Sequence, residues 1–281
     1  MTDGPKQPLR ILVIGAHPDD AELKVGGMAA RWAAAGHHVK LVSVTNGDAG
    51  HYEMGGAPLA RRRRAEAQAA AAVIGIDYTV LDNHDGELEP SLANRRTIVR
   101  LIREIGPDLI LTHRPNDYHP DHRYTAQLVQ DAAYMVTVPG LAALTPHLAA
   151  NPIILYMSDR FQRPYPFQPD VVVDIDDVLD LKLEMLHQHS SQVYEWLPFN
   201  HGDREEVPSG DDERRAWLRE RYAPRYAEMA DHYRDRLISL YGATHGAQVR
   251  HAEAFEVSEY GARLTPDAFQ WLFPFVPQAR L

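Results

Sequence analysis

The chain has 281 residues, of which 44% are hydrophobic and 24% are charged. This composition is typical of a soluble globular protein, and the length fits one large α/β domain or one domain with an extension. A formal net charge of −10 argues against a nucleic-acid partner that is held through phosphate contacts. Because the chain has no Cys, disulfides, thiolate nucleophiles and Cys-based zinc sites are excluded.

No stretch of the sequence predicts a membrane segment. Residues 1–10 lack the apolar core of a signal peptide, and no apolar run approaches the roughly 20 residues of a membrane helix. We therefore expect a cytoplasmic protein without a membrane span.

Short apolar runs alternate along the chain with segments of helical periodicity. This order predicts a Rossmann-like α/β fold, with a mostly parallel sheet and helices on both of its faces. The first strand is not followed by GxGxxG, so a dinucleotide fingerprint is absent where it would be expected. The expected strands are 11–14, 39–44, 78–81, 108–112, 153–156, 171–175 and 254–257, and the expected helices are 28–35, 58–74, 92–105, 124–135, 178–189 and 217–240.

Polar side chains follow the first strand directly. His17, Asp19, Asp20 and Glu22 come within six positions after the apolar run 11–14. Ligands of parallel α/β sheets collect at the carboxyl ends of the strands, and proline at position 18 stiffens this loop. The loop could hold a metal ion through two of its side chains and leave a third free.

A second polar stretch, 113–123, follows the fourth strand. It contains three His and two Asp, and it lies at a strand end that can face the first loop. His119 and His122 are three residues apart near a helix start, so their rings should lie on one side. The arginine run 61–64 suits a solvated helix face, although four successive residues span more than one turn and one can point toward the cleft.

These motifs resemble the signature of the PIG-L/LmbE family of zinc-dependent N-deacetylases, which act on N-acetylglucosamine conjugates and related amides. The resemblance is carried by Ala16-His17-Pro18-Asp19-Asp20-x-Glu22 and by His119-Pro120-Asp121-His122. It extends through Arg63-x-x-Glu66, Asp85-Gly86-x-Leu88 and His189-x-Ser191-Gln192, and so covers roughly residues 9–195.

The resemblance implies a metal site and a catalytic pair. His17, Asp20 and His122 form a two-His, one-carboxylate set, which suits a catalytic zinc with an open position. Asp19 is then the general base, and His119 is expected to stabilise the oxyanion. Asp121 or Asp117 would hold the His119 ring, Glu22 is expected to support the site, and His189 is expected to structure a helix end.

Three further residues are expected to contact the substrate. By resemblance, Arg63 and Asp85 stand where relatives hold sugar hydroxyls, and Asp48 is a similar case. An Arg and an Asp at a cleft rim suit vicinal diols.

Together these features predict a hydrolase that removes an acyl group, expected to be acetyl, from the amide nitrogen of an amino-sugar conjugate such as an N-acetylglucosamine derivative. The alternatives are an amidase that acts on a thiol-sugar conjugate and a non-catalytic metal-containing binding module. Zn²⁺ is the expected cofactor and Fe²⁺ the alternative. We expect a catalytic domain over 8–200 and a C-terminal extension, 201–281, that packs on it. The sequence leaves a homo-oligomer open.

Overall fold

A computed structural model describes residues 7–278, so residues 1–6, which include most of the segment inspected for a signal peptide, lie outside it. Its centre is a seven-stranded sheet in the order β3-β2-β1-β4-β5-β7-β6. The first five of these strands are parallel, and β7 runs antiparallel to both of its neighbours. The strands are β1 (Arg10–Gly15), β2 (His38–Thr45), β3 (Asp77–Asn83), β4 (Leu109–Thr112), β5 (Ile153–Met157), β6 (Val171–Asp174) and β7 (Ala252–Val257).

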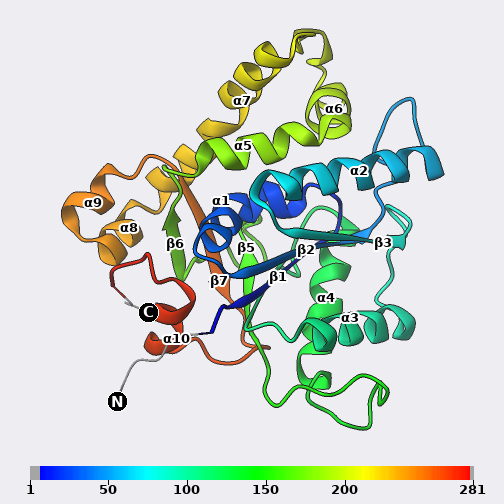
Figure 1. Ribbon diagram of the computed structural model, residues 1–281. Coiled ribbons are helices and arrows are strands. Elements are labelled where there is room, and N and C mark those ends of the chain that lie inside the picture. The colour runs from blue at the N-terminus through cyan, green and yellow to red at the C-terminus, as the bar shows by residue number, and fades with distance from the viewer. Residues whose placement is uncertain (1–6, 279–281) are drawn as a thin grey trace.

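Helices cover both faces of the sheet, which confirms the predicted α/β class. Figure 1 shows α1, α2 and α5 on one face and α3 and α4 on the other. The alternate residues of β1 divide between these layers: Leu12 and Ile14 pack in the cluster with α3 and α4, and Ile11 and Val13 pack in the cluster with α1. The helices of this part of the chain are α1 (Asp20–Ala34), α2 (Gly56–Ile74), α3 (Leu92–Ile105), α4 (Pro120–Met135) and α5 (Leu179–Gln188).

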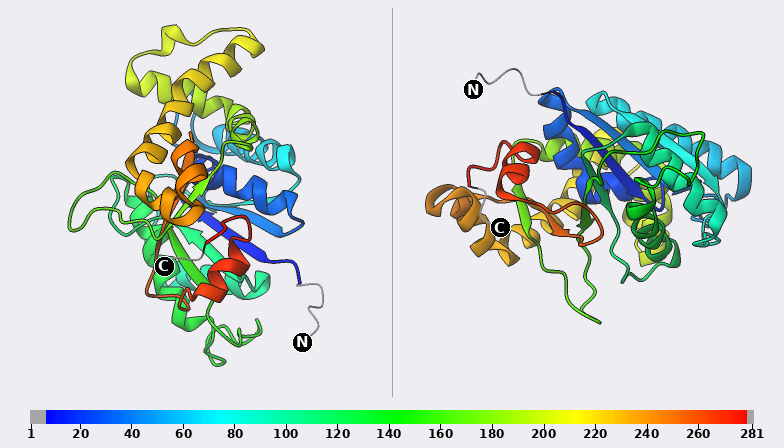
Figure 2. Two further views of the ribbon diagram at one scale, coloured as in Figure 1. Left: turned by 90° about the vertical axis from the view of Figure 1, so that its left-hand side faces the viewer. Right: turned by 90° about the horizontal axis from the view of Figure 1, so that it is seen from below.

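The C-terminal third is mostly helical. It also returns to the sheet, because β7 lies between β5 and β6 and is hydrogen-bonded to both. Figure 2 shows this segment in yellow, orange and red, and its right-hand view has the orange and red parts at one side of the molecule. Its elements include the π-helix η1 (Ser191–Trp196), α6 (Leu197–His201), the 3₁₀ helix η2 (Arg204–Glu206), α7 (Asp211–His232), α8 (Arg234–Tyr241), α9 (Ala243–Gln248) and α10 (Pro266–Leu272). The proposed domain boundary at residue 200 stays a prediction.

Several predicted boundaries were wrong. Helix α1 begins at Asp20 rather than near Met28, because the acidic residues of the first polar loop form its first turn, where carboxylates favour a helix N-terminus. The expected helix 217–240 is two helices that meet at Tyr233, an arrangement that buries Leu237 and Leu240 in the main core. The polar run 201–213 contains the short helix η2 and the start of α7.

In the sheet, β2 and β3 lie on one side of β1, and β4 and β5 lie on its other side. The strand order therefore reverses between β1 and β4, and α/β sheets bind ligands just outside the carboxyl ends of the strands at such a point. The paired residues Ile14 and Thr112 stand at this edge, immediately before the two polar loops. Within residues 7–278, no helix combines the length and apolar content needed to cross a bilayer.

Candidate metal and catalytic site

Three side chains from the two polar loops meet at the switch point. His17 and Asp20 come from the β1–α1 loop and the first turn of α1, and His122 comes from the first turn of α4. Nδ1 of His17 lies 3.2 Å from Nε2 of His122, and Oδ1 of Asp20 lies 3.4 Å from the same Nε2. All three residues are buried. The predicted triad is thus brought together from positions about a hundred residues apart in the sequence.

The outer nitrogens of both imidazoles face carboxylates. Nε2 of His17 lies 3.1 Å from both Asp121 and Asp85, and Nδ1 of His122 lies 3.1 Å from Asp117. Carboxylates favour a proton on the nitrogen that faces them, so each ring presents the lone pair of its inner nitrogen to the centre of the triad. Two lone pairs so close together favour a cation between them. Burial opposes charge on His17, but the surrounding carboxylates raise its pKa well above the usual value.

Asp20 is fixed by the backbone. Its Oδ2 accepts hydrogen bonds from the N–H groups of Ala16 and His17, at 2.9 and 2.7 Å. Burial would raise the pKa of Asp20, but the neighbouring His122 holds it well below its usual value, so this carboxyl stays ionised. Its other oxygen, Oδ1, faces His122 and is available to a metal ion.

His113, which the sequence analysis left without a role, lies behind the triad. Its ring stacks on His122 with centroids 4.0 Å apart, and its Nε2 accepts the N–H of Ala16 at 3.1 Å. Burial and the neighbouring His122 lower the pKa of His113 to about 4, so it is neutral near pH 7. Because its Nε2 lone pair is already engaged, His113 is a weaker candidate ligand than His17. Its place directly after β4 was the sequence signal for a site residue.

Three groups of side chains in the described chain have donor atoms close enough to share one ion. They are Asp20, His113 and His122; His17, His119 and His122; and His17, Asp85, His119 and Asp121. His17, His119 and His122 each belong to two of these groups, and no single group contains His17, Asp20 and His122 together. The distances of 3.2 and 3.4 Å to Nε2 of His122 are what bring the predicted ligands together, and the ligand set stays a prediction.

Asp19 lies beside the triad in a strained backbone conformation, with φ at 145°. Arg63 stands behind it: one guanidinium nitrogen is 3.4 Å from Oδ1 of Asp19 and donates to the carbonyl of Pro18 at 2.8 Å. Burial raises the pKa of Asp19 to about 6, although the positive charge of Arg63 opposes the rise. Strain held in this way is typical of functional residues, and a carboxylate with a pKa near 6 suits a general base.

His119 is half-buried and its ring meets the His17 ring edge to face, with centroids 4.5 Å apart. Its Nδ1 accepts the N–H of Asp121 as the cap of α4. We predicted that Asp121 or Asp117 would hold the His119 ring, but Asp121 Oδ2 lies 4.0 Å from Nδ1 of His119 and 3.1 Å from Nε2 of His17. The reason is that the N–H groups of Gly86 and of Leu88 draw the Asp121 carboxylate toward His17. Burial, with His17 and His122, lowers the pKa of His119.

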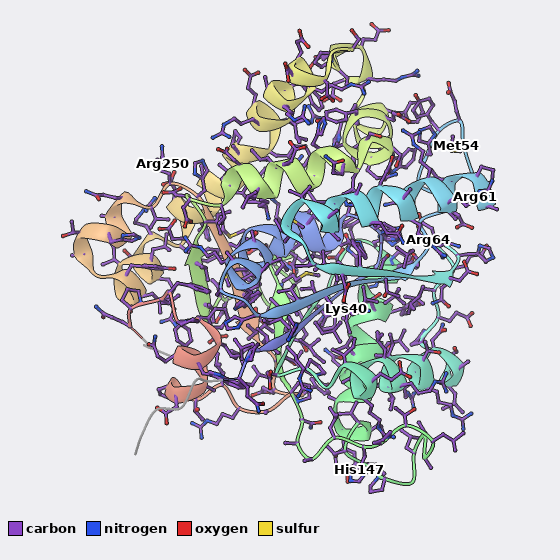
Figure 3. The ribbon with its side chains drawn as sticks, viewed as in Figure 1. Lys40, Met54, Arg61, Arg64, His147 and Arg250 are labelled. Carbon is purple, nitrogen blue, oxygen red and sulfur yellow. The ribbon has the colours of Figure 1, made fainter. Side chains whose placement is uncertain are left out.

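The predicted substrate residues form one side of the site. Asp85 Oδ2 lies 3.6 Å from Arg63, and the hydrogen bond from His17, acting against burial, lowers the pKa of Asp85 to about 2. Arg63 is buried, whereas Arg61 and Arg64, labelled in Figure 3, are exposed. Asp48 accepts from His84 and from the N–H of Asp85, so both of its oxygens support the Asp85 loop.

Two further elements support this side. Gly47 has φ at 69°, and a Cβ there would meet the Arg63 guanidinium at 2.4 to 2.7 Å, so only glycine fits. Glu22 is fully buried and its Oε1 lies 2.9 Å from Nε2 of His189, which places the predicted supporting residue against the helix-end histidine.

A cavity of about 460 Å³ opens beside the triad. Asp20 and His122 form its inner wall, and Tyr118 and Phe161 are exposed aromatic residues in its lining. The remaining lining residues come largely from beyond β5: Leu23, Lys24, Asp117, Ser158, Asp159, Arg160, Leu197, His201, Arg225, Tyr226, Met229, Ala252 and Glu253.

Comparison with known proteins shows to which family the chain belongs. Residues 12–133 match the profile of the PIG-L family, described as GlcNAc-PI de-N-acetylase. Over 207 residues the chain is 30% identical to the diacetylchitobiose deacetylase of Thermococcus kodakarensis, an alignment that spans 68% of this chain and 74% of the relative. The chain belongs to the PIG-L (LmbE-like) deacetylase family.

Two other similarities refine the placement. The structure of the N,N'-diacetylchitobiose deacetylase of Pyrococcus horikoshii superposes with a TM-score of 0.69 at 24% identity, covering 91% of this chain and 85% of that one. This likeness confirms the LmbE-like fold. The 4-oxalmesaconate hydratase of Pseudomonas putida is 28% identical over 196 residues, covering 66% of this chain and 74% of the relative. The relatives of this chain are therefore named for two different reactions, deacetylation and hydration.

Proposed function

We propose that this PIG-L family member is a zinc-dependent N-deacetylase that removes an acetyl group from the amide nitrogen of an amino-sugar conjugate. One arrangement carries the proposal: two imidazole nitrogens and a carboxylate oxygen converge at 3.2 to 3.4 Å beside the buried carboxylate of Asp19. The names of the deacetylase relatives support the same reaction.

The donor set fits a divalent ion. Two neutral imidazoles and one ionised carboxylate suit Zn²⁺ and leave room for further ligands, and Fe²⁺ accepts the same donors. His17, Asp20 and His122 would hold the ion. When bound, it would supply Lewis-acid chemistry, acidifying the attacking water and polarising the amide carbonyl.

Asp19 and His119 have different roles in moving protons during the reaction. Asp19 in its ionised form takes a proton from the attacking water as the new C–O bond forms. His119 packs edge to face against the His17 ring, and its Nε2, which takes no part in capping α4, donates to the oxygen that gains negative charge. The C–N bond then breaks, the amine nitrogen takes up the proton that Asp19 received from the water, and acetate and the free amino sugar leave.

The substrate is a small acylated amino sugar with a further substituent. Arg63 and Asp85 offer a paired donor and acceptor for sugar hydroxyls on one side of the triad. The cavity on the other side has room for the rest of the conjugate. Its lining mixes charged side chains with exposed aromatic rings, which suits a polar ring better than an alkyl chain.

The hydratase relative favours a second candidate, addition of water to a carbon–carbon double bond. A general base and a divalent-ion site would serve that reaction too. The two functions differ in their product, since only the deacetylase releases a primary amine and acetate.

The test measures amine release from N-acetylglucosamine and N,N'-diacetylchitobiose, and in parallel the loss of 4-oxalmesaconate absorbance. The assay compares the wild-type protein with Asp19→Asn at matched zinc content. We expect amine release by the wild type and a loss on the order of 10²–10⁴-fold in the variant. Hydration without amine release would replace the proposal with the second candidate. Saturable binding of these sugars without either reaction would indicate a binding module.

A further inference from the structure

The middle of α1 receives a side chain from the far end of the chain. The N–H groups of Gly27 and Met28 donate to Oε1 and Oε2 of Glu253, at 2.8 and 2.9 Å. In a regular α-helix these groups point to the carbonyls of residues 23 and 24. Glu253 lies on β7 and is 3% exposed. Its carboxylate is therefore inserted against the side of the helix that carries Asp20.

The carbonyl of Leu23, which a regular helix would pair with the N–H of Gly27, also has hydrogen-bond partners from outside α1. The oxygen of Leu23 accepts from Nζ of Lys182 on α5 at 3.0 Å and from the hydroxyl of Tyr226 on α7 at 3.2 Å. Nζ of Lys182 lies 2.5 Å from Oε1 of Glu253, and both side chains are inaccessible to solvent. A buried ion pair thus bonds to both the N–H and the C=O groups of one helical turn.

The Gly26–Gly27 pair explains how the ion pair comes so close. A Cβ at Gly27 would lie 2.7 Å from Ile175 and 3.1 Å from Oε1 of Glu253, and a Cβ at Gly26 would lie 3.1 Å from Lys182. Two glycines inside a helix are otherwise unfavourable. Here they allow the carboxylate and the ammonium group to reach the backbone.

One hydrogen bond connects this turn to the catalytic loop. The N–H of Leu23 donates to the carbonyl of Asp19 at 3.0 Å, and the C=O of the same residue accepts from Lys182 and Tyr226, so the Leu23 backbone connects these side chains to Asp19. Asp19 has the strained φ of 145°, and Asp20 follows it as the first residue of α1. Strained residues persist where their surroundings fix them.

We propose that Lys182 and Glu253 are positioning residues, whose ion pair fixes the first turns of α1 and thereby the Asp19 carboxylate and the Asp20 ligand. Both lie outside residues 12–133, so the segments that follow the family match complete the catalytic unit. This inference rests on the proposed function for its kinetic consequences, but its structural consequence is measurable without any activity.

The decisive variant is Lys182→Met with Glu253→Gln, which removes both charges together and leaves no unpaired buried charge. Its control is Leu240→Ala, a buried core position on α8, a helix that packs mainly on α9 and β6, chosen to lower stability away from the first turns of α1. Tyr226→Phe removes a single hydrogen bond to Leu23 and serves where the double variant does not fold.

Three readouts are compared with the control at equal fraction folded: kcat and KM for amine release, the visible spectrum of the Co²⁺-loaded protein, and hydrogen exchange of amides 23–28. We expect kcat to fall on the order of 10- to 100-fold, a larger effect than on KM, because a small displacement of catalytic groups has effects of that size. The Co²⁺ spectrum should change and amides 23–28 should exchange faster, with smaller changes in Tyr226→Phe.

Unchanged kcat, spectrum and exchange relative to Leu240→Ala would overturn the positioning role. If the wild-type protein releases no amine, the proposed function fails, and the spectrum and the exchange rates still decide the inference. For such an inactive protein, an unchanged Co²⁺ spectrum together with unchanged exchange of amides 23–28 overturns the positioning role, and changes in both support it.

Discussion

Nδ1 of His17 and Nε2 of His122 lie 3.2 Å apart, and each ring turns its other nitrogen toward a carboxylate. This arrangement is what the proposed metal site requires of two ligating histidines, because the carboxylates hold the outer nitrogens and leave the inner ones for an ion. Protons and metal ions compete for it, because the same carboxylates that raise the pKa of His17 also attract a divalent ion. Metal affinity should consequently weaken as the pH is lowered.

The first prediction concerns metal content. Purified protein should contain about one equivalent of divalent ion, as expected for a single catalytic site, and His122→Ala should lose most of it. Removal of the ion should lower Tm, because an ion at 100 times its Kd stabilises the folded state by about 2.7 kcal/mol. The matched control is His147→Ala, an exposed histidine labelled in Figure 3. Full occupancy in His122→Ala would contradict the ligand set.

The second prediction concerns Asp121, whose carboxylate faces Nε2 of His17. Asp121→Asn should weaken metal binding on the order of 10- to 100-fold, because the asparagine no longer fixes the tautomer and orientation of the ring. Asp131→Asn on the same helix removes a surface partner of Arg95 and should leave affinity unchanged. Competition with a chromophoric chelator measures both. Equal metal affinities in the two variants would contradict a role of Asp121 at His17 and favour its originally expected role at His119.

The third prediction concerns the pH dependence of catalysis. Burial raises the pKa of Asp19 to about 6, and only the ionised form accepts a proton. Activity should thus rise with pH through the pKa of Asp19, which gives the pH profile an acidic limb. A bound cation favours the ionised carboxylate, so this limb should lie at or below pH 6. In Asp19→Asn, kcat/KM should fall on the order of 10²–10⁴-fold and the limb should disappear. A limb that persists in the residual activity of the variant would assign it to another group.

The fourth prediction separates Arg63 from Asp85. Asp85→Ala should mainly raise KM, because a contact present in both the ground and transition states contributes to binding alone. Arg63→Ala should also lower kcat, since Arg63 holds the carbonyls of Pro18 and Gly47 around the strained Asp19. Arg64→Ala is the exposed control from the same helix. A pure KM effect in Arg63→Ala would mean that the loop holds its conformation without the guanidinium.

The sequence by itself determined the fold class and the elements that carry the chemistry. The apolar run before His17 and the run before His113 mark two buried strands, and polar residues at their ends predict a shared site, because parallel strands end at one edge of the sheet. The spacing of His119 and His122 placed both at a helix start, as the structure has them. The start of α1 was missed, since helical periodicity is weak where acidic residues form a first turn.

Only the tertiary structure decided which partner each side chain has. Asp121 turned to His17 rather than His119 because backbone N–H groups from another loop direct it, and those groups are distant in sequence. Lys182 and Glu253 are 71 residues apart, and no sequence motif singled out either of them. Their burial against Gly27 depends on three elements packing together, and local patterns carry no information about such packing. Contacts of this kind are set by the global arrangement of the sheet, which is why they could not be predicted from the sequence.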